Sequence, residues 1–376
     1  MEEEQKVPEQ PEQPEQVQEE EKKKKKMPLW LKRVIITVSA ILMALLLLGG
    51  AALWVLYHYA GRLGDYDKEN DKPISLEQAD KLDKDDALPM DPDDENNPDL
   101  PSVDDIDPTP VDPPVVNKDK DVVNILIVGQ DSKNSNVRTR SDTMILITIH
   151  TKAKQVTLTS FLRDAYVTIP GYADNKLNSA YEKGGLKLLN ETLKVNFGVE
   201  VDGNVIIDFS SFQKIIDMLD GVDIQLTERE AEYLVNGGKH EDIRPGWNRL
   251  NGQQALEYAR LREIDNDYKR ANRQRTVILS LIERYKTLSL TEMLAMLDQI
   301  LPLIVTDMDE NTIVELVLKC GPLAAAASYG TQQIPADGTF KQGFVKVREG
   351  LKNWFQYNIN FDENRRIIQE IMNGNR

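Results

Sequence analysis

Short apolar runs separated by turn residues dominate the middle of the chain. Residues 122–129, 143–150 and 155–160 are near-continuous apolar stretches rich in β-branched side chains. Runs of this length and composition are typical of strands that are buried on both faces of a sheet. Residues 151–154 leave room only for a tight connection, so the second and third strands are predicted to form a hairpin.

Helical and extended patterns alternate after this hairpin. The spacing of apolar residues predicts a helix that ends near Gly198, a strand over 203–209, a Ser-capped helix that ends at Gly221, and a strand over 222–226. Asn251 is expected to cap a further helix. This alternation predicts the α/β class, as an α-β-α sandwich with a central mixed β-sheet.

The last part of the chain, from Ser289 to Arg376, shows helical periodicity in three segments and no linker of its own. It is therefore assigned to the same domain, which is predicted to span residues 122–376. No period of about 20 to 50 residues recurs, which argues against a repeat architecture.

The first third of the chain has a different composition. Residues 1–33 are rich in Glu, Gln, Pro and Lys, and they are predicted to form a disordered cytoplasmic tail. Residues 34–57 carry no charge and are long enough to cross a hydrocarbon core of about 30 Å as a helix. A cleaved signal peptide would have a shorter apolar stretch of roughly 7–15 residues, so a retained single-pass anchor is expected.

The charges that flank this apolar run predict its orientation. Basic residues precede it and acidic residues follow it, which places the N-terminus in the cytoplasm and the remaining chain outside the cell membrane. Residues 58–121 are acidic and rich in proline and are predicted to form an extended extracellular linker. Residues 64–121 hold twenty acidic residues and six lysines, which accounts for most of the net charge of −16.

Several function classes are disfavoured. Cys320 is the only cysteine, so no intramolecular disulfide can form and core burial must hold the external domain together. The sequence contains neither GxxxxGK[ST] nor GxSxG, so neither a nucleotide P-loop nor a hydrolase nucleophile elbow is supported. The external location and the lack of a net basic face argue against nucleic-acid binding.

Charged side chains gather where the three central strands begin or end. Because adjacent antiparallel strands run in opposite directions, these places meet at one end of the sheet, where ligands often bind. Two of these residues could instead have a purely structural role. Asp131 could form a turn, and Asp142 could pair with Arg140. The charged residues at this end are Asp131, Arg138, Arg140, Asp142, Arg163 and Asp164.

The chemistry of these residues indicates a phosphate site. Arginine presents a planar fork of donors that matches phosphate oxygens, and two nearby aspartates suit Mg²⁺. A later segment adds Arg260 and Arg262, then Arg270, Arg273 and Gln274 at helical spacing. A dense group of guanidiniums with few carboxylates repels itself unless an anion is supplied, so the group favours phosphate binding over separate surface ion pairs.

A series of motifs over roughly residues 122–285 resembles the LytR-CpsA-Psr family of bacterial cell-envelope proteins. The layout of tail, membrane helix, linker and external domain is also similar. Lys133 and Leu162 depart from the usual family residues, which puts substrate preference in doubt more than activity. The motifs are NILIVGQDS, RTRSDTMILITI, SFLRDAYVTIPG, NKLNSAYEKGG, VIIDF, GVDI, ALEYARLR and DYKRANRQR.

The resemblance implies a sandwich fold with a hydrophobic groove for a polyisoprenyl chain. It implies a membrane-anchored phosphotransferase that moves an anionic glycopolymer, such as teichoic acid or capsular polysaccharide, from a polyprenyl-pyrophosphate carrier to peptidoglycan. Two other functions would use the same residues. One is a lipid pyrophosphatase, and the other is a non-catalytic envelope regulator that binds lipid pyrophosphate.

The resemblance also implies roles for individual residues. Asp131 and Asp142 would hold Mg²⁺, and Asp131, Arg163 and Asp164 would be catalytic. Either Asp131 or Asp164 would take the proton of the acceptor hydroxyl, and the sequence leaves this choice open. The residues implied to bind pyrophosphate are Arg138, Arg140, Arg163, Lys176, Arg260, Arg262, Arg270 and Gln274, among which Arg138 and Lys176 match less well.

Overall fold

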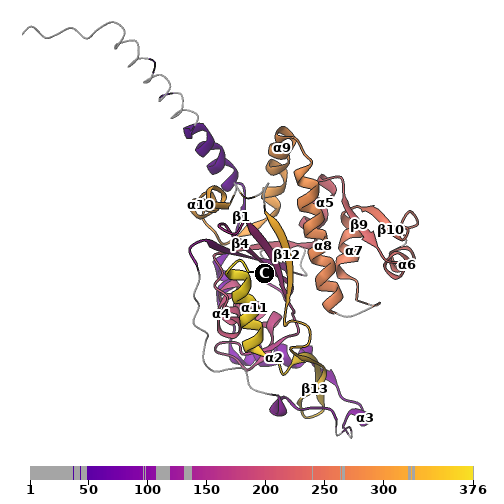
Figure 1. Cartoon of the computed structure of the whole chain (residues 1–376). Helices are drawn as coiled ribbons and strands as arrows, with labels where there is room; N and C mark the ends of the chain where they lie inside the picture. The colour runs from indigo at the N-terminus through magenta and orange to yellow at the C-terminus, as the bar shows by residue number, and fades with distance from the viewer. Residues whose placement is uncertain are drawn as a thin grey trace, which may run out of the picture. The chain divides into compact units, whose positions relative to one another are not determined.

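The chain divides into two compact units, Met1–Trp54 and Val55–Arg376, and the second holds all the elements named below (Figure 1). The predicted tail and most of the predicted membrane helix lie outside the described residues. Among the residues described, no helix has both the length and the apolar character needed to span a bilayer. The computed structural model describes positions 37, 43, 49–95, 97, 99–106, 119–130, 138–238, 240–262, 264, 267–320, 323 and 327–375.

A mixed sheet of seven strands forms the centre of the second unit, in the order β1-β11-β8-β3-β4-β5-β12. The three predicted central strands are confirmed as β3, β4 and β5, which pair antiparallel in sequence order. β8 pairs parallel with β3, and β12 pairs parallel with β5. The bounds are β1 (Gly64–Asp65), β3 (Val122–Gln130), β4 (Ser141–His150), β5 (Gln155–Phe161), β8 (Gly203–Asp208), β11 (Val305–Thr306) and β12 (Ser328–Ile334).

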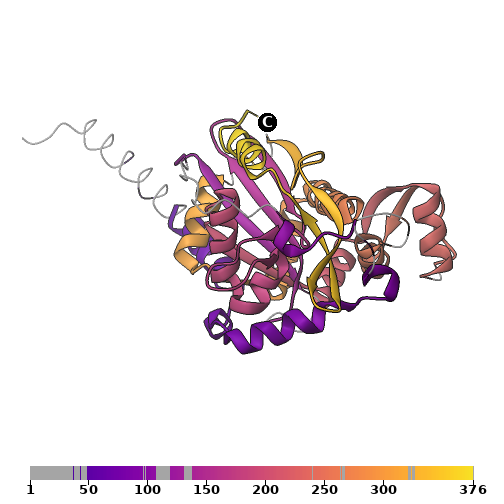
Figure 2. The same ribbon diagram turned by 90° about the horizontal axis from the view of Figure 1, so that it is seen from below.

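Helices cover both faces of this sheet, as Figures 1 and 2 show, so the predicted α/β sandwich with a mixed sheet is confirmed. α4 and α11 pack on one face against β4. α5, α7 and α8 form the layer on the other face. The bounds are α4 (Leu177–Phe197), α5 (Phe209–Met218), α7 (Gly252–Arg260), α8 (Asp267–Lys286) and α11 (Phe361–Met372).

The alternation of side chains along β3 separates a filled core from a cavity. Leu126 and Val128 are fully buried in the core formed with α4, where Leu189 is also fully buried. Ile127 and Gly129 point to the opposite face, because successive residues of a strand alternate between faces. These two residues line an apolar cavity beneath the second helical layer.

Residues 64–106, which their composition assigned to an extended linker, belong to the folded unit. β1 lies in the central sheet, α2 (Leu76–Asp86) begins with a capping box made by Ser75 and Gln78, and β2 (Leu88–Pro89) pairs with β14 (Leu351–Tyr357). The predicted linker boundary at residue 121 is therefore wrong for these residues. Residues 107–118 lie outside the described residues.

Cations of the domain explain why this acidic segment folds. The Nζ atom of Lys183, whose side chain is fully buried, lies 2.9 Å from Asp83 Oδ1. Lys176 Nζ lies 3.1 Å from Asp86 Oδ2. A count of acidic residues along the sequence cannot include partners that are about a hundred positions away. Asp83 and Asp86, which contributed to the predicted self-repulsion, are therefore paired with cations in space.

The last part of the chain contains strands in addition to helices. The three predicted helical segments are confirmed as α9 (Leu290–Ile300), α10 (Glu310–Cys320) and α11. The strands β12, β13 (Lys341–Arg348) and β14 were not predicted, because they mix polar with apolar residues. β13, β14 and β2 form a small separate sheet.

The predicted helix ends are mostly confirmed. Gly198 ends α4 with φ of 70°, and Gly221 follows α5 with φ of 89°, as expected for glycine after a helix. The cap of α5 differs from the prediction, because Asp208 rather than a serine accepts from the backbone N–H of Ser211 at 2.7 Å. The other described elements are η1 (Lys68–Asp71), α3 (Pro92–Glu95), η2 (Val103–Asp105), β6 (Tyr166–Val167), β7 (Asn175–Lys176), β9 (Val222–Leu226), α6 (Glu228–Asn236), β10 (Gly246–Leu250) and η3 (Leu301–Leu303).

Candidate functional site

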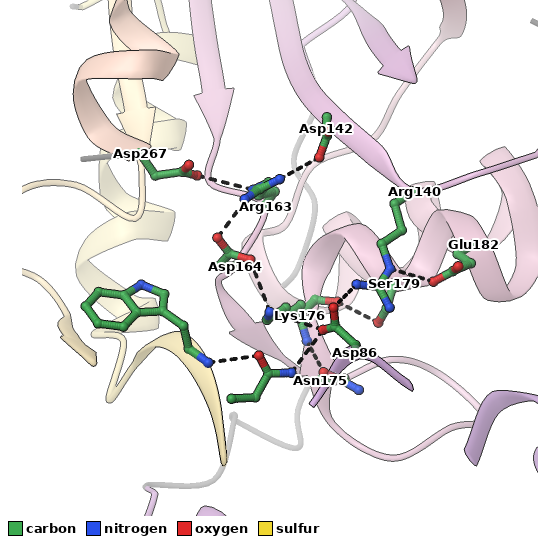
Figure 3. Close-up of polar contacts among 12 residues, drawn as sticks. Asp86, Arg140, Asp142, Arg163, Asp164, Asn175, Lys176, Ser179, Glu182 and Asp267 are labelled. Carbon is green, nitrogen blue, oxygen red and sulfur yellow. Dashed lines mark hydrogen bonds and ion pairs between the residues drawn. The ribbon is translucent and has the colours of Figure 1, made fainter. Parts of the chain in front are cut away.

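Arg163 lies at the centre of a group of charged side chains at one end of the sheet (Figure 3). It follows β5, whose end lies beside the start of β4 because Ser160 pairs with Ile145. Arg163 Nη1 donates to Asp142 Oδ1 at 2.6 Å, and its Nε lies 3.3 Å from Asp164 Oδ2. The predicted meeting of these three charged residues is confirmed, and Asp142 pairs with Arg163 rather than with Arg140.

Asp267 is a third carboxylate in this group, and the sequence did not single it out. It is the first residue of α8, and its Oδ2 lies 3.6 Å from Arg163 Nε and 3.1 Å from Arg270 Nη2. An acidic residue in the first turn of a helix is common in any protein, so the pattern gave no signal of this contact. The expectation of very few carboxylates is therefore wrong around Arg163.

Burial and neighbouring charges set the protonation of this group. Burial raises the pKa of the Asp142 carboxyl, but the guanidinium of Arg163 and those further away hold it below its usual value. Burial lowers the pKa of Arg270 to about 10. Burial also lowers the pKa of Arg262, and repulsion by Arg163 adds to the effect. A bound anion would lower the cost of burying these guanidiniums and would reduce the repulsion between them. The arginines therefore favour an anionic ligand.

A cavity of about 630 Å³, here called the arginine pocket, opens beside this group. Its wall contains four guanidiniums and two carboxylates, those of Asp142 and Glu257, and His240 Nε2 already lies 2.9 Å from Glu257 Oε2. The wall therefore carries net positive charge. The predicted pyrophosphate ligands that line this pocket are Arg163, Arg260, Arg262, Arg270 and Gln274.

Two helices bring the later residues to the pocket. Asn251 caps α7 as predicted, and Arg260 at the end of that helix places its Cζ 4.4 Å from the centre of the Phe209 ring. Arg270 and Gln274 lie one turn apart on α8. Arg273, which was predicted to share their face, instead donates from Nε to Glu230 at 2.7 Å.

An apolar cavity of about 120 Å³ adjoins the arginine pocket. Both cavities are lined by Thr143, Phe209, Leu256, Arg260 and Gln274. A phosphate group held by the arginines would therefore have an apolar chamber beside it. The other apolar lining residues are Ile127, Ile145, Ile207, Phe212, Ile215, Ala259, Ile278 and Leu281.

Arg138 and Arg140 do not line the arginine pocket. Arg138 Nη1 donates to the backbone carbonyl of Lys72 at 3.0 Å. Arg140 Nε donates to Glu182 Oε2 at 2.8 Å, and its Nη1 pairs with Asp86 (Figure 3). Their predicted role as phosphate ligands would require both side chains to leave these partners.

Lys176 also lies outside the arginine pocket, because its ammonium pairs with Asp86 and lies 3.5 Å from Asp164 Oδ1. Asp86 is the focus of this second group. Burial raises its pKa, but a hydrogen bond from Asn353 and the charges of Lys176 and Arg140 bring the pKa down to about 2. Asp86 lies in the segment that was predicted to be a linker, which explains why sequence reasoning missed it.

We expect Asp86→Asn to lower the free energy of unfolding by about 2 kcal/mol at pH 7, given about 1.4 kcal/mol per pKa unit. Because the folded state lowers the pKa, the contribution is present above about pH 4 and is lost as the pH falls toward 2. Unfolding curves of both proteins across this pH range would measure it. Asp85→Asn, at the exposed neighbouring position, is the matched control, and a difference that persists at pH 2 would contradict the assignment.

Comparison with known proteins identifies the family. The LytR_cpsA_psr family model matches residues 91–357. The chain belongs to the LytR-CpsA-Psr family. It is 31% identical over 263 residues to the polyisoprenyl-teichoic acid–peptidoglycan teichoic acid transferase TagU of Oceanobacillus iheyensis, which covers 68% of this chain and 76% of TagU. It is 37% identical over 171 residues to the regulatory protein MsrR of Staphylococcus aureus, covering 45% of this chain.

Solved structures of the LytR-CpsA-Psr family have the same fold. The protein YwtF (TagT) of Bacillus subtilis, with bound octaprenyl pyrophosphate lipid, superposes with a TM-score of 0.51 at 23% identity, over 68% of this chain and 90% of that one. This chain matches about half the length of MsrR.

Only one of the two aspartates that the LytR-CpsA-Psr resemblance implies as magnesium ligands lies among the described residues. Asp131 lies outside the described residues, and Asp142 Oδ1 accepts from Arg163. Among the described residues, no group of three or more His, Cys, Asp or Glu side chains could hold a metal ion. The described side chains therefore do not form a metal site by themselves, and Mg²⁺ binding stays a prediction.

Proposed function

We propose that this protein is a membrane-anchored phosphotransferase that moves an anionic glycopolymer from a polyprenyl-pyrophosphate carrier to peptidoglycan. The observation that carries the proposal is the junction between the arginine pocket and the apolar cavity. One part suits a pyrophosphate and the other suits the first isoprene units of its lipid. The names of TagU, as a teichoic acid transferase, and of YwtF, with its bound lipid pyrophosphate, support it.

In the proposed reaction, a sugar hydroxyl of the acceptor attacks the phosphorus that carries the glycopolymer. A new P–O bond forms, the bond from this phosphorus to the bridging oxygen breaks, and the electron pair leaves with polyprenyl phosphate. The hydroxyl proton passes to a carboxylate. Arg163, Arg262 and Arg270 would neutralise the charge that develops on the phosphate oxygens, which is the main catalytic contribution that a protein makes to phosphoryl transfer.

We propose that residues 34–57 anchor the protein in the cell membrane, with the N-terminus in the cytoplasm and the folded unit outside. The last residue of this run and the chain just after it contact the domain directly. Tyr57 donates to Asn311 at 2.9 Å, and Arg62 Nη2 lies 3.3 Å from Asp298 Oδ1. A polyprenyl carrier stays in the bilayer, so an anchor at this position would keep the enzyme beside its donor substrate.

The proposal is tested by incubating the full-length protein in detergent with a synthetic polyprenyl-pyrophosphate glycan and peptidoglycan oligomers. We expect glycan on the oligomers together with an equal amount of polyprenyl phosphate. Release of polyprenyl phosphate that does not depend on the oligomers would identify a lipid pyrophosphatase. Tight lipid binding without turnover would identify an envelope regulator.

We propose Mg²⁺ as the cofactor, held by Asp131 and Asp142 together with substrate oxygens, where it would neutralise phosphate charge. Addition of EDTA is expected to lower the transfer rate about tenfold or more, and excess Mg²⁺ should restore it. The transfer assay above measures this effect. Full activity in EDTA would exclude Mg²⁺ as a cofactor, and the arginines alone would then neutralise the phosphate charge.

A further inference from the structure

A second cavity of about 630 Å³ lies against the arginine group and has an aromatic wall. Its polar lining includes Asp164 and Lys176, and its aromatic lining consists of Phe344 and Trp354 from the β13–β14 hairpin. Nothing in the proposed donor site uses this space. We call it the hairpin cavity.

The hairpin cavity shares Arg163 and Arg262 with the arginine pocket and shares no other lining residue with it. The remaining residues of the arginine pocket come mainly from α5, α7 and α8. Those of the hairpin cavity come mainly from β13, β14 and the end of α2, together with Asp267 at the start of α8. The two guanidiniums therefore form the boundary between the cavities. Asp164, which is 7% exposed, lines only the hairpin cavity.

The aromatic wall is supported by contacts within the hairpin and remains accessible. Trp354 and Phe344 are directly opposite each other in the β-ladder, with ring centres 5.2 Å apart and planes at 85°. Lys352 Nζ lies 4.9 Å from the centre of the Phe344 ring, on the same hairpin. Trp354 nevertheless remains 38% exposed. A large ring that is fixed in place but open to solvent is suited to stack on a ligand.

Polar groups line the same cavity as this ring, as binding of a sugar would require. A pyranose ring has an apolar C–H face, which packs on an aromatic ring, and an edge of hydroxyl groups, which need hydrogen-bond partners. The side chains of Gln342 and Asn353 border the cavity together with the carboxylate of Asp164. Asn353 is held in place because its Nδ2 donates to Asp86 Oδ2 at 2.9 Å.

We propose that the hairpin cavity binds a sugar ring of the acceptor glycan, with Trp354 as the stacking platform. This inference rests on the proposed phosphotransferase function and deepens it. In phosphoryl transfer the attacking and leaving oxygens lie roughly in line on opposite sides of the phosphorus. The hairpin cavity shares no lining residue with the apolar cavity. If the phosphorus is held at Arg163 and Arg262 and polyprenyl phosphate leaves toward the apolar cavity, the attacking hydroxyl would arrive from the hairpin cavity.

The same geometry places Asp164 on the acceptor side. An acceptor hydroxyl in the hairpin cavity would lose its proton to this carboxylate while its oxygen forms the new bond to phosphorus. The P–O bond to polyprenyl phosphate breaks in the same step, so no further reactant is required. The sugar of the donor is attached to the phosphorus and does not have to occupy the in-line position.

The test compares the full-length wild-type protein in detergent with Trp354→Ala, Trp354→Phe and Trp247→Ala. The last removes an exposed tryptophan, 73% exposed on β10, that borders neither the arginine pocket nor the hairpin cavity. KM values for the lipid-linked donor and for a peptidoglycan oligosaccharide are measured separately. Trp354→Ala is expected to raise the acceptor KM about tenfold and to leave the donor KM unchanged, whereas Trp354→Phe should restore most of the affinity.

Each outcome decides the inference. An unchanged acceptor KM in Trp354→Ala, with wild-type transfer intact, would overturn the acceptor subsite and leave the proposed function standing. A raised donor KM would assign the cavity to the donor glycan instead and also overturn the inference. If the wild type transfers nothing, calorimetric titration with the oligosaccharide decides, because binding that is lost in Trp354→Ala supports the subsite and absence of binding to the wild type rejects it.

Discussion

Arg163→Ala should lower the turnover number for glycopolymer transfer by about a hundredfold to a thousandfold. Removal of one preorganised donor to developing negative charge costs about 2.7–4 kcal/mol in enzymes where it has been measured. Arg163 borders the arginine pocket and the hairpin cavity and contacts Asp142, Asp164 and Asp267. Its loss would remove a phosphate donor and disorder the carboxylates around it. Steady-state release of polyprenyl phosphate measures the effect.

Loss of folding must be separated from loss of catalysis in this variant, because three carboxylates would lose their shared cation. Arg163→Lys keeps the charge but loses the forked donors, and it should still be at least about tenfold slower than wild type. Arg366→Ala removes an exposed arginine of α11 that pairs with Glu363, and it should have no effect on turnover. Wild-type rates in both Arg163 variants, with unchanged melting temperatures, would exclude Arg163 from the reaction.

Ala259→Phe should weaken the binding of polyprenyl pyrophosphate about thirtyfold and leave the affinity for inorganic pyrophosphate unchanged. Ala259 is buried on α7 and lines the apolar cavity, whose volume is only about 120 Å³. A phenyl ring there would occupy the space of two or three methylene groups of the lipid, each worth about 0.8 kcal/mol. Calorimetric titration with the two ligands measures the difference.

The two ligands provide an internal control for the cavity substitution. Overpacking of a core costs about 1–3 kcal/mol of stability, so the melting temperature must be recorded as well. Ala295→Phe, at an exposed position of α9, adds the same ring away from the cavity and should leave both affinities unchanged. An equal loss of affinity for both ligands in Ala259→Phe would show that the substitution had damaged the arginine pocket. Unchanged lipid affinity would place the lipid elsewhere.

The sequence allowed prediction of those parts of the site that depend on strand order. β3, β4 and β5 are continuous apolar runs, and the short connection between β4 and β5 made their pairing predictable, which brought Asp142, Arg163 and Asp164 together. Arg270 and Gln274 followed from helical spacing. Periodicity did not place Arg273 correctly, because tertiary contacts rather than spacing determine that it binds Glu230.

The missed residues reach the site from distant segments. Asp86 belongs to a segment whose composition is that of a disordered linker, and Trp354 belongs to a hairpin with a mixed polar and apolar pattern. Their positions depend on the pairing of β2 with β14 and on ion pairs with Lys176 and Arg140. A local pattern does not encode such contacts. Asp131 lies outside the described residues, so the choice between Asp131 and Asp164 as base rests on the cavity that Asp164 lines.

The most direct test of the phosphotransferase proposal is a single-turnover reaction in water enriched in oxygen-18. Full-length protein, polyprenyl-pyrophosphate glycan and peptidoglycan oligomers are mixed, and the products are analysed by mass spectrometry. We expect glycan joined to the oligomers through a phosphodiester, with no oxygen-18 in this product or in polyprenyl phosphate. Incorporation of oxygen-18 into either phosphate would show that water is the acceptor and would contradict the transferase account.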